Sequence, residues 1–294
     1  MIRIDNATCK SCGLCGKVCP RHLTEVVEEN GKKETVVASE RADLCMTCGH
    51  CVAVCPTGSI SVDGLNADAF QPLSPMEISE GQLLTLLRQR RSIRRYKKRP
   101  VPRDVLDRIV EAVHASPTGT GNVSNGVIII DSRDTIESMM KHTYAMYEEL
   151  DRALNNPIAR FFVKRKAGAR ALRTLDRFVM PGMRWYMRWR EEGRGDEISR
   201  DCPALMLFSG PADEPMVEEN CTIAAFHAIL MAEALGVGTC FNHLIPPACN
   251  RVPALRAMLD LNDGTEVHAS VTMGYPAVKF LRAVHHRAAE VRYV

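Results

Sequence analysis

The chain has 294 residues, of which 46% are hydrophobic and 25% are charged. Its length suggests about two domains, and its composition is ordinary for a soluble globular protein. A net charge of +3 and an aromatic content of 5% argue against a nucleic-acid-binding surface. The N-terminal residues lack a signal segment, and the apolar stretch 222–235 is interrupted by His227 and Glu233. We therefore expect a cytoplasmic protein without an integral membrane segment.

Eight of the twelve cysteines lie before residue 56, in two runs with the same spacing. Each run has three cysteines separated by two residues, then a fourth after three residues, followed by a proline. This spacing is typical of two-cluster bacterial ferredoxins, in which the fourth cysteine of each run ligates the other [4Fe–4S] cluster. It predicts one cluster on Cys9, Cys12, Cys15 and Cys55, and a second on Cys19, Cys45, Cys48 and Cys51. Zinc sites, the alternative, usually show two pairs of cysteines instead.

The remaining N-terminal residues indicate a small module. Asn30-Gly31, flanked by extended residues, predicts a hairpin within 26–39. We expect a ferredoxin domain at 1–63, a linker at 64–78 and a second domain at 79–294. Because a two-cluster module transfers single electrons and does no bond chemistry alone, the second domain should hold a catalytic cofactor or a docking surface.

The second domain shows alternating helix and strand signals. Residues 79–82 (SEGQ) match a capping box before a leucine-rich helix, and Pro102 at a first-turn position opens another helix. Short apolar runs predict strands at 127–130, 204–208 and 267–273. Residues 219–235 predict a central helix that is apolar on nearly every side and ends at Gly236. These patterns indicate an α/β or α+β domain.

Three segments of this domain together resemble the nitroreductase family of FMN enzymes. They are residues 90–96 (RRSIRRY), 116–122 (SPTGTGN) and 234–240 (ALGVGTC), with Gly274-Tyr275-Pro276 further on. With the cysteine runs, the whole chain resembles the ferredoxin-fused nitroreductases, apart from a divergent segment at 141–200. The resemblance implies an α+β fold with a mixed sheet surrounded by helices. It also implies a homodimer with FMN at the subunit interface.

The resemblance assigns candidate FMN-binding residues to four places. In chain order, the first set would hold the phosphate and the second would contact the flavin ring or ribityl chain. The third would run near the isoalloxazine ring, and the fourth would again face the phosphate. These sets are Arg90, Arg91, Ser92 and Arg94; Pro117, Thr118, Gly119 and Asn122; Gly236, Gly238 and Thr239; and Arg282 and Arg287.

Each set also has a plainer interpretation. The first set could be a solvated basic helix end, and the second an ordinary turn. The third could be a helix C-cap before a strand, and the fourth could be surface basic residues. Gly121 is an extra residue before Asn122 relative to the family pattern. The four late cysteines, Cys202, Cys221, Cys240 and Cys249, lack the spacing of a third cluster and are expected to be core residues.

The segment 141–200 contains 14 Lys or Arg residues, 8 Asp or Glu residues and both tryptophans. In the resembling family this stretch covers the substrate face of the flavin, and here it could bind a planar, anionic substrate. Ordinary amphipathic helices are the simpler interpretation. An interfacial membrane contact through residues 184–190 (RWYMRWR) is a third.

The functional hypothesis is an FMN-dependent oxidoreductase that passes electrons through two [4Fe–4S] clusters to or from FMN. It would reduce a small organic acceptor of the nitroaromatic, quinone or enone type, with NAD(P)H or reduced ferredoxin as donor. The alternative is an electron-transfer protein that relays electrons to a protein partner. A non-redox role, such as flavin breakdown or a cluster-bearing regulator, is the third reading. No catalytic acid or base stands out.

Overall fold

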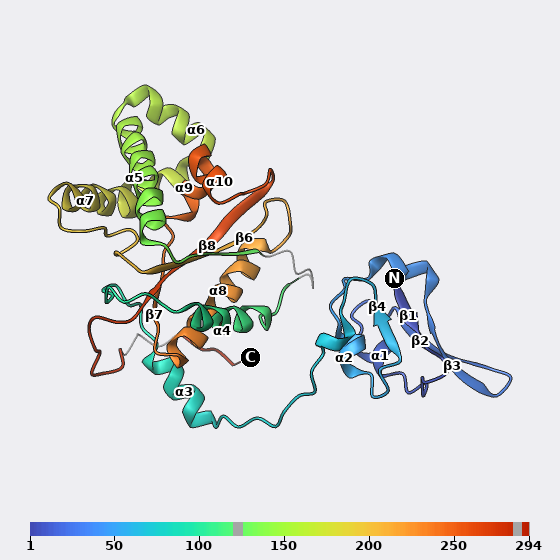
Figure 1. Ribbon diagram of the computed structural model, residues 1–294. Helices are drawn as coiled ribbons and strands as arrows, with labels where there is room; N and C mark the ends of the chain where they lie inside the picture. Colours follow the sequence, from blue (N-terminus) through green and yellow to red (C-terminus); the bar gives the residue numbers. More distant parts are fainter. Residues whose placement is uncertain (120–125, 285–289, 294) are drawn as a thin grey trace. The chain divides into compact units, whose positions relative to one another are not determined.

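The computed structural model describes residues 1–119, 126–284 and 290–293, and Figure 1 traces them as two compact units. The first unit contains Met1–Glu77, and the second contains Ile78–Pro117 and the C-terminal half of the chain. In the part of the chain that is described, no helix has both the length and the apolar character needed to cross a bilayer.

Strands from near the start and the end of the cysteine-rich region pair with each other in the first unit. Strand β1 (Ile2–Ile4) pairs antiparallel with β4 (Ile60–Val62), so that Ile2 lies opposite Val62. Strands β2 (Thr24–Glu29) and β3 (Lys32–Val37) form the expected hairpin, with Asn30 and Gly31 at positive φ in its turn. Short helices α1 (Leu14–Val18), η1 (Ser39–Leu44), α2 (His50–Val54) and η2 (Ala67–Ala69) complete the unit.

The second unit begins with a capped helix. In α3 (Glu80–Gln89) the Gln82 N–H donates to the Ser79 hydroxyl and the Ser79 N–H donates to the Gln82 side chain, which confirms the capping box. Leu83, Leu84 and Leu87 of this helix are exposed. Helix α4 (Arg103–His114) follows, with Pro102 as its N-cap, one position before the expected first turn.

A four-stranded antiparallel sheet forms the centre of the second unit. Its order is β5 (Gly126–Ile130), β6 (Ala204–Pro211), β8 (Thr265–Gly274) and β7 (Gly238–Phe241). The parallel component is a bridge between Ser92 and Thr239 at the β7 edge. The remaining helices are α5 (Arg133–Asn155), α6 (Pro157–Thr174), η3 (Leu175–Val179), α7 (Met180–Glu191), α8 (Val217–Ala234), α9 (Pro246–Arg251) and α10 (Pro253–Met258).

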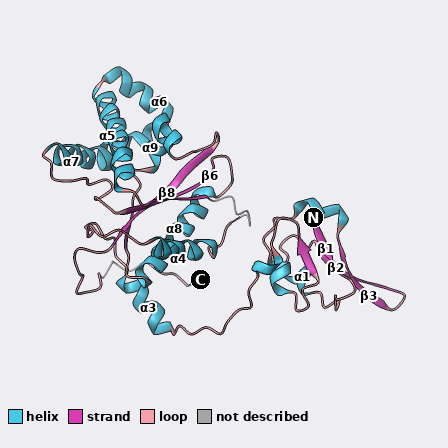
Figure 2. Cartoon of the chain, viewed as in Figure 1, coloured by secondary structure: helices cyan, strands magenta, loops and turns pink. Residues whose placement is uncertain are grey.

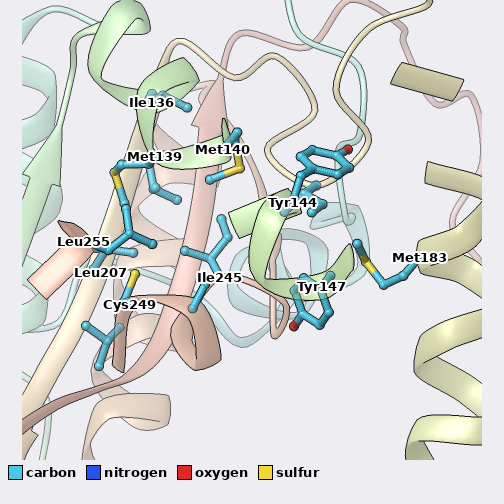
Figure 3. Close-up of a cluster of buried hydrophobic side chains, with 14 of the residues drawn as sticks. Ile136, Met139, Met140, Tyr144, Tyr147, Met183, Leu207, Ile245, Cys249 and Leu255 are labelled. Carbon is cyan, nitrogen blue, oxygen red and sulfur yellow. The ribbon is translucent and has the colours of Figure 1, made fainter. Parts of the chain in front are cut away.

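Helices cover both faces of this sheet (Figure 2) because its central strands are apolar on both sides. On β6, Met206 and Phe208 pack with α4 and α8, whereas Leu205 and Leu207 pack with α5, α7, α9 and α10. Figure 3 shows part of this second cluster around Leu207. The expected α+β class, with a mixed sheet surrounded by helices, is confirmed.

Gly238 marks a close approach between β7 and the segment after α3. A Cβ atom at this position would lie 2.6 Å from Ile93 Cγ1 and 2.9 Å from Pro276 Cγ. Because this packing cannot absorb a methyl group without moving, we expect Gly238→Ala to destabilise the protein by about 1–3 kcal/mol, measured by urea unfolding.

Gly182 provides the matched control for this substitution. It lies inside α7, and a Cβ there would meet nothing within 4 Å. Gly182→Ala should therefore leave the protein as stable as the wild type or stabilise it by up to about 1 kcal/mol. Equal unfolding midpoints for the two variants would contradict the proposed packing role of Gly238.

Candidate cofactor sites

The eight N-terminal cysteines line two separate cavities, each built from both runs. One cavity is lined by Cys9, Cys12, Cys15 and Cys55, together with residues that include Ile4, Thr35 and Ile60. The other is lined by Cys19, Cys45, Cys48 and Cys51, together with residues that include Ile2, Leu23 and Val62. The fourth cysteine of each run thus lies with the first three of the other, as the ferredoxin spacing anticipates.

The two runs fold in the same way. Helices α1 and α2 start at Gly13 and Gly49, whose φ angles of 71° and 76° lie in the left-handed region that favours glycine. Each run also has a positive φ at the residue before its second cysteine, with 48° at Ser11 and 49° at Thr47. These backbone reversals wrap the first three cysteines of each run around its cavity.

Backbone N–H groups point at the sulfur atoms of this arrangement. The Ser11 N–H donates to Cys9 Sγ at 3.4 Å, the Leu23 N–H to Cys19 Sγ at 3.4 Å, and the Ser59 N–H to Cys55 Sγ at 3.3 Å. Such donors stabilise negative charge on a thiolate and tune the potential of a bound cluster. The cavities therefore fit a group that needs four thiolates with hydrogen-bond support.

The pKa values of two cysteines reflect these surroundings. Burial raises the pKa of the Cys51 thiol to about 11, and the nearby Cys48, Cys19 and Cys45 add to the rise. Burial also acts to raise the pKa of Cys55, but hydrogen bonds from Thr57, Ser59 and Gly58 outweigh it and leave the pKa lowered. Among the described residues, no three His, Cys, Asp or Glu side chains converge on one point that would hold a single metal ion.

A cleft of about 730 Å³ lies in the second unit, at the β7 edge of the sheet. Residues from α3, the C-terminal end of α8, the start of β7 and the chain after β8 line it. Its lining is strongly basic. The charged residues are Arg88, Arg91, Lys97, Lys279 and Arg282, with Glu233 opposing them.

Arg91 is the residue in this cleft with an unmet hydrogen-bonding need. In the part of the chain that the structure describes, its buried Nε has no hydrogen-bond partner, whereas its Nη1 donates to the Arg90 carbonyl oxygen at 2.5 Å. A guanidinium binds phosphate through two parallel N–H donors. The cleft therefore fits the dianionic phosphate of FMN, with Arg91 as one donor and Arg282 as a second cation in the lining.

The segment after α3 is held against the sheet by backbone and side-chain hydrogen bonds. The Ile93 N–H donates to the Thr239 carbonyl oxygen at 2.8 Å, and the Lys97 N–H to the Tyr275 carbonyl oxygen at 2.8 Å. The Tyr96 hydroxyl contacts the Ile93 carbonyl oxygen and the Thr272 hydroxyl, both at 2.8 Å. Burial raises the pKa of Tyr96 well above its usual range, so it stays protonated. These contacts fix where Arg91 lies.

Glu233, near the end of α8, opposes the basic side of the cleft. Burial raises the pKa of its carboxyl group, while Arg90 and Arg91 act to lower it. Because its carboxylate would repel a bound phosphate, we expect Glu233→Gln to tighten FMN binding by about threefold to tenfold. FMN fluorescence titration measures the dissociation constants.

The pH dependence of FMN binding tests whether the charge of Glu233 causes this difference in affinity. The wild-type Glu233 carboxylate becomes protonated as the pH falls through its raised pKa, whereas the amide side chain of the Glu233→Gln variant never carries charge. The ratio of the wild-type to the variant dissociation constant should therefore fall toward one at low pH. A ratio independent of pH would mean that the Glu233 charge does not reach the phosphate.

The other expected FMN residues are placed in different ways. Gly236 and Gly238 line the cleft with Arg91 and Arg282. Arg90 lies close enough to Glu233 to influence its pKa, and Ser92 pairs with Thr239 beside the cleft. Arg94, Pro117, Thr118 and Gly119 are not among the described residues that line it. Asn122 and Arg287 lie outside the described residues.

Sequence reasoning missed the role of Arg95. Its guanidinium forms an ion pair with Glu197 at 2.7 Å, and Arg200 pairs with the other oxygen of the same buried carboxylate at 2.9 Å. Arg95 is adjacent to Arg94 in a run of arginines, so only the ion pair with a residue 102 positions away reveals its structural role. Within the basic motif, Arg91 thus lies in the cleft, whereas Arg95 binds the loop before β6.

The four late cysteines behave as expected. Cys202, Cys221, Cys240 and Cys249 are buried within the two hydrophobic clusters or the β7 strand. Burial raises the pKa of Cys202, Cys221 and Cys249 to about 12 in each case. They are small core residues and take no part in the cluster cavities.

Comparison with known proteins identifies the two domains. The nitroreductase family model matches residues 87–275, and a 4Fe-4S dicluster domain model matches residues 8–59. The chain belongs to the nitroreductase family, because the first match covers more than half of it. It is therefore an FMN-dependent oxidoreductase of nitroreductase type with an N-terminal ferredoxin domain, which confirms the resemblance.

Relatives of known sequence or structure are distant. A curated NADH dehydrogenase from Thermus thermophilus is 27% identical over 191 residues, which cover 64% of this chain and 84% of that protein. A crystal structure of a nitroreductase with bound FMN from Bacteroides fragilis is 19% identical, with a TM-score of 0.54 and coverage of 72% and 98%. One from Desulfitobacterium hafniense, also with bound FMN, is 18% identical with the same TM-score, at 72% and 97% coverage. These structural likenesses concern the fold.

Proposed function

We propose that this protein passes single electrons between an external donor and FMN through two [4Fe–4S] clusters, and that FMN reduces a small organic acceptor. One observation carries the proposal: the same chain combines two four-cysteine cavities with a basic cleft, in which the buried Arg91 Nε has no hydrogen-bond partner from residues 1–119, 126–284 or 290–293. When bound, FMN supplies the conversion between one-electron and two-electron transfer.

The residues of the chain divide this work between the two units. The eight cysteines hold the clusters, and backbone N–H groups such as that of Ser59 stabilise their sulfur atoms. Arg91 and Arg282 hold the phosphate, and the close-packed Gly238 lets the chain after α3 approach β7. Tyr96 fixes this chain through Thr272, and thereby positions Arg91.

The name of the Thermus relative, NADH dehydrogenase, supports NAD(P)H as a donor, and the ferredoxin unit supports a reduced ferredoxin as the other candidate. Quinones, nitroaromatics and enones are the proposed acceptors. A relay of electrons to a protein partner is the alternative outcome, and it would be established if the reduced protein transferred electrons to proteins but to none of these small molecules.

A stopped-flow experiment without oxygen tests the electron path. Holoprotein is mixed with a chemically reduced viologen, which gives single electrons, and cluster and FMN absorbance are followed together. We expect the clusters to be reduced first and FMN afterwards. In Cys9→Ala/Cys55→Ala, which removes two ligands of one cavity, FMN reduction should slow while FMN content stays unchanged. An unchanged rate would show that the clusters lie outside the path.

We also propose a homodimer that closes the cofactor cleft. Leu83, Leu84 and Leu87 of α3 are exposed, and Phe280 and Leu281, which line the cleft, are about 51% and 82% exposed. A second copy that covers these side chains would bury apolar surface and exclude water from the cleft. Light scattering after size exclusion should give twice the chain mass, and Leu83→Ser/Leu87→Ser should lower both that mass and FMN affinity.

A further inference from the structure

Helix α6 presents an exposed apolar stripe. Of its 18 residues, Leu172 is the one that is buried. Ile158, Phe161 and Phe162 are 71%, 61% and 61% exposed, and their spacing of three and four residues places them on one face of the helix. Water-exposed phenylalanines side by side on one helix mark a surface that meets something other than water.

The opposite face of α6 fixes which way this stripe points. Val163 packs against the cluster formed by α5, α7 and the sheet; Leu172 packs there too, but it lies beyond a kink in the helix at Gly168. Arg160 Nη1 donates to Asp176 Oδ1 of η3 at 3.0 Å and to the Leu154 carbonyl oxygen at 3.4 Å. Val163 and Arg160 lie on the other side of this part of the helix, so the exposed phenylalanine stripe faces solvent.

Positive charge surrounds the stripe. Between Pro157 and Arg190 the chain has ten Lys or Arg residues and one acidic residue, Asp176. Lys164, Arg165 and Lys166 follow the phenylalanines after one residue, Val163, and are exposed. Their long side chains can extend along an apolar surface while the charged ends reach a polar layer.

The next element adds a second exposed aromatic ring. Phe178 of η3 is 69% exposed, and the Arg177 guanidinium lies 5.3 Å from its ring centre. By contrast, Trp189 of α7 donates from Nε1 to the Arg194 carbonyl oxygen at 2.8 Å and stacks against the Arg194 guanidinium. The tryptophan segment singled out in the sequence is thus partly engaged within the protein, and the aromatic surface lies on α6 and η3.

We propose that α6 and η3 dock this protein peripherally on an anionic lipid surface. Helices that lie in a bilayer interface combine an apolar stripe rich in Phe or Trp with flanking Lys and Arg. A bilayer surface offers both matching environments at adjoining depths, because acyl chains accept the phenyl rings and phosphate headgroups accept the cations. This surface is independent of the redox function.

Other occupants fit these residues less well. A second copy meeting through the same face would place Lys164, Arg165 and Lys166 of the two chains close together, since a two-fold interface pairs a patch with itself. An acidic protein would satisfy the charges, but its carboxylates would lose water against Phe161 and Phe162 without a hydrogen-bond donor there. An anionic bilayer meets neither obstacle.

Vesicle sedimentation with the full-length holoprotein tests the proposal. Vesicles of phosphatidylcholine with phosphatidylglycerol are compared with vesicles of phosphatidylcholine alone, at low and high salt. We expect binding to the anionic vesicles that weakens with salt. Lys164→Gln/Arg165→Gln/Lys166→Gln should reduce the partition coefficient by about a hundredfold, and Phe161→Ser/Phe162→Ser by about tenfold or more.

Two controls separate docking from misfolding and from protein contacts. Lys32→Gln/Lys33→Gln removes exposed charge from the β2–β3 hairpin, and Met258→Ser removes an exposed apolar side chain from α10; both should bind vesicles like the wild type. All variants should keep the wild-type unfolding midpoint and oligomeric mass. The proposal fails if the wild type ignores anionic vesicles, or if the phenylalanine variant still binds them. It also fails if the phenylalanine variant binds vesicles normally but has an altered oligomeric mass, or an altered rate of reduction by an acidic ferredoxin.

Discussion

Cys9→Ala/Cys55→Ala will keep one intact cluster, whereas Cys9→Ala/Cys19→Ala will damage both, although each variant removes two cysteines. The reason is that Cys9 and Cys55 line the same cavity, while Cys9 and Cys19 line different ones. With about eight irons per wild-type chain, the first variant should retain about four and the second clearly fewer. Iron and sulfide assays on protein purified without oxygen, together with electron paramagnetic resonance of the reduced protein, provide the measurement.

The complementary pairs give the controls. Cys45→Ala/Cys19→Ala should resemble Cys9→Ala/Cys55→Ala, and Cys45→Ala/Cys55→Ala should resemble Cys9→Ala/Cys19→Ala. If the iron content instead followed membership of a run, so that Cys9→Ala/Cys19→Ala kept one intact cluster, each run would bind its own cluster and the exchange of the fourth ligand would be wrong.

Arg91→Ala will weaken FMN binding by about tenfold to a hundredfold with little loss of stability. Its buried Nε has no partner among the described residues, so the charge-assisted hydrogen bonds to phosphate should account for most of its contribution. Arg91→Lys keeps the charge but loses the planar pair of donors, and its dissociation constant should lie between those of Arg91→Ala and the wild type. Fluorescence titration with FMN and urea unfolding of the FMN-free protein measure the two effects.

Arg95→Ala is the matched substitution four residues further on. It removes one of two partners from the buried Glu197, so it should lower stability by about 1–2 kcal/mol and leave FMN affinity near the wild-type value. If Arg95→Ala weakened FMN binding as much as Arg91→Ala, the division of the arginine motif between cleft and loop would be incorrect.

The cysteine cavities and the main helices could be predicted from the sequence because their signals are local. The spacing of the two runs, the Ser79–Gln82 capping box and the apolar runs of β6 and β8 each act within a few residues. Helix boundaries do not follow as closely from local signals: α8 begins at Val217, two residues before the expected start. A strand after the helix C-cap at Gly236 is the plainer interpretation of that segment, and β7 confirms it, but its pairing with β8 involves residues distant in the chain and could not be predicted.

The direction of each arginine in residues 90–96 could not be predicted. Arg90, Arg91, Arg94 and Arg95 look alike in sequence, and their environments are set by the pairing of Ser92 with Thr239 and of Tyr96 with Pro276. These partners are more than a hundred residues away in the chain. For the same reason the exposure of Phe161 and Phe162 depends on which face of α6 packs on α5, which local periodicity does not decide.

The chain from Ser92 to Tyr96 also protects an exposed edge of the sheet. β7 is one of the two edge strands, and the Ser92–Thr239 bridge covers part of its open row of backbone donors and acceptors. Uncovered strand edges recruit other chains and lead to aggregation. Deleting the residues before Pro102 to isolate a smaller flavin domain would therefore remove a guard against self-association, and such a fragment should precipitate even if its hydrophobic core were intact.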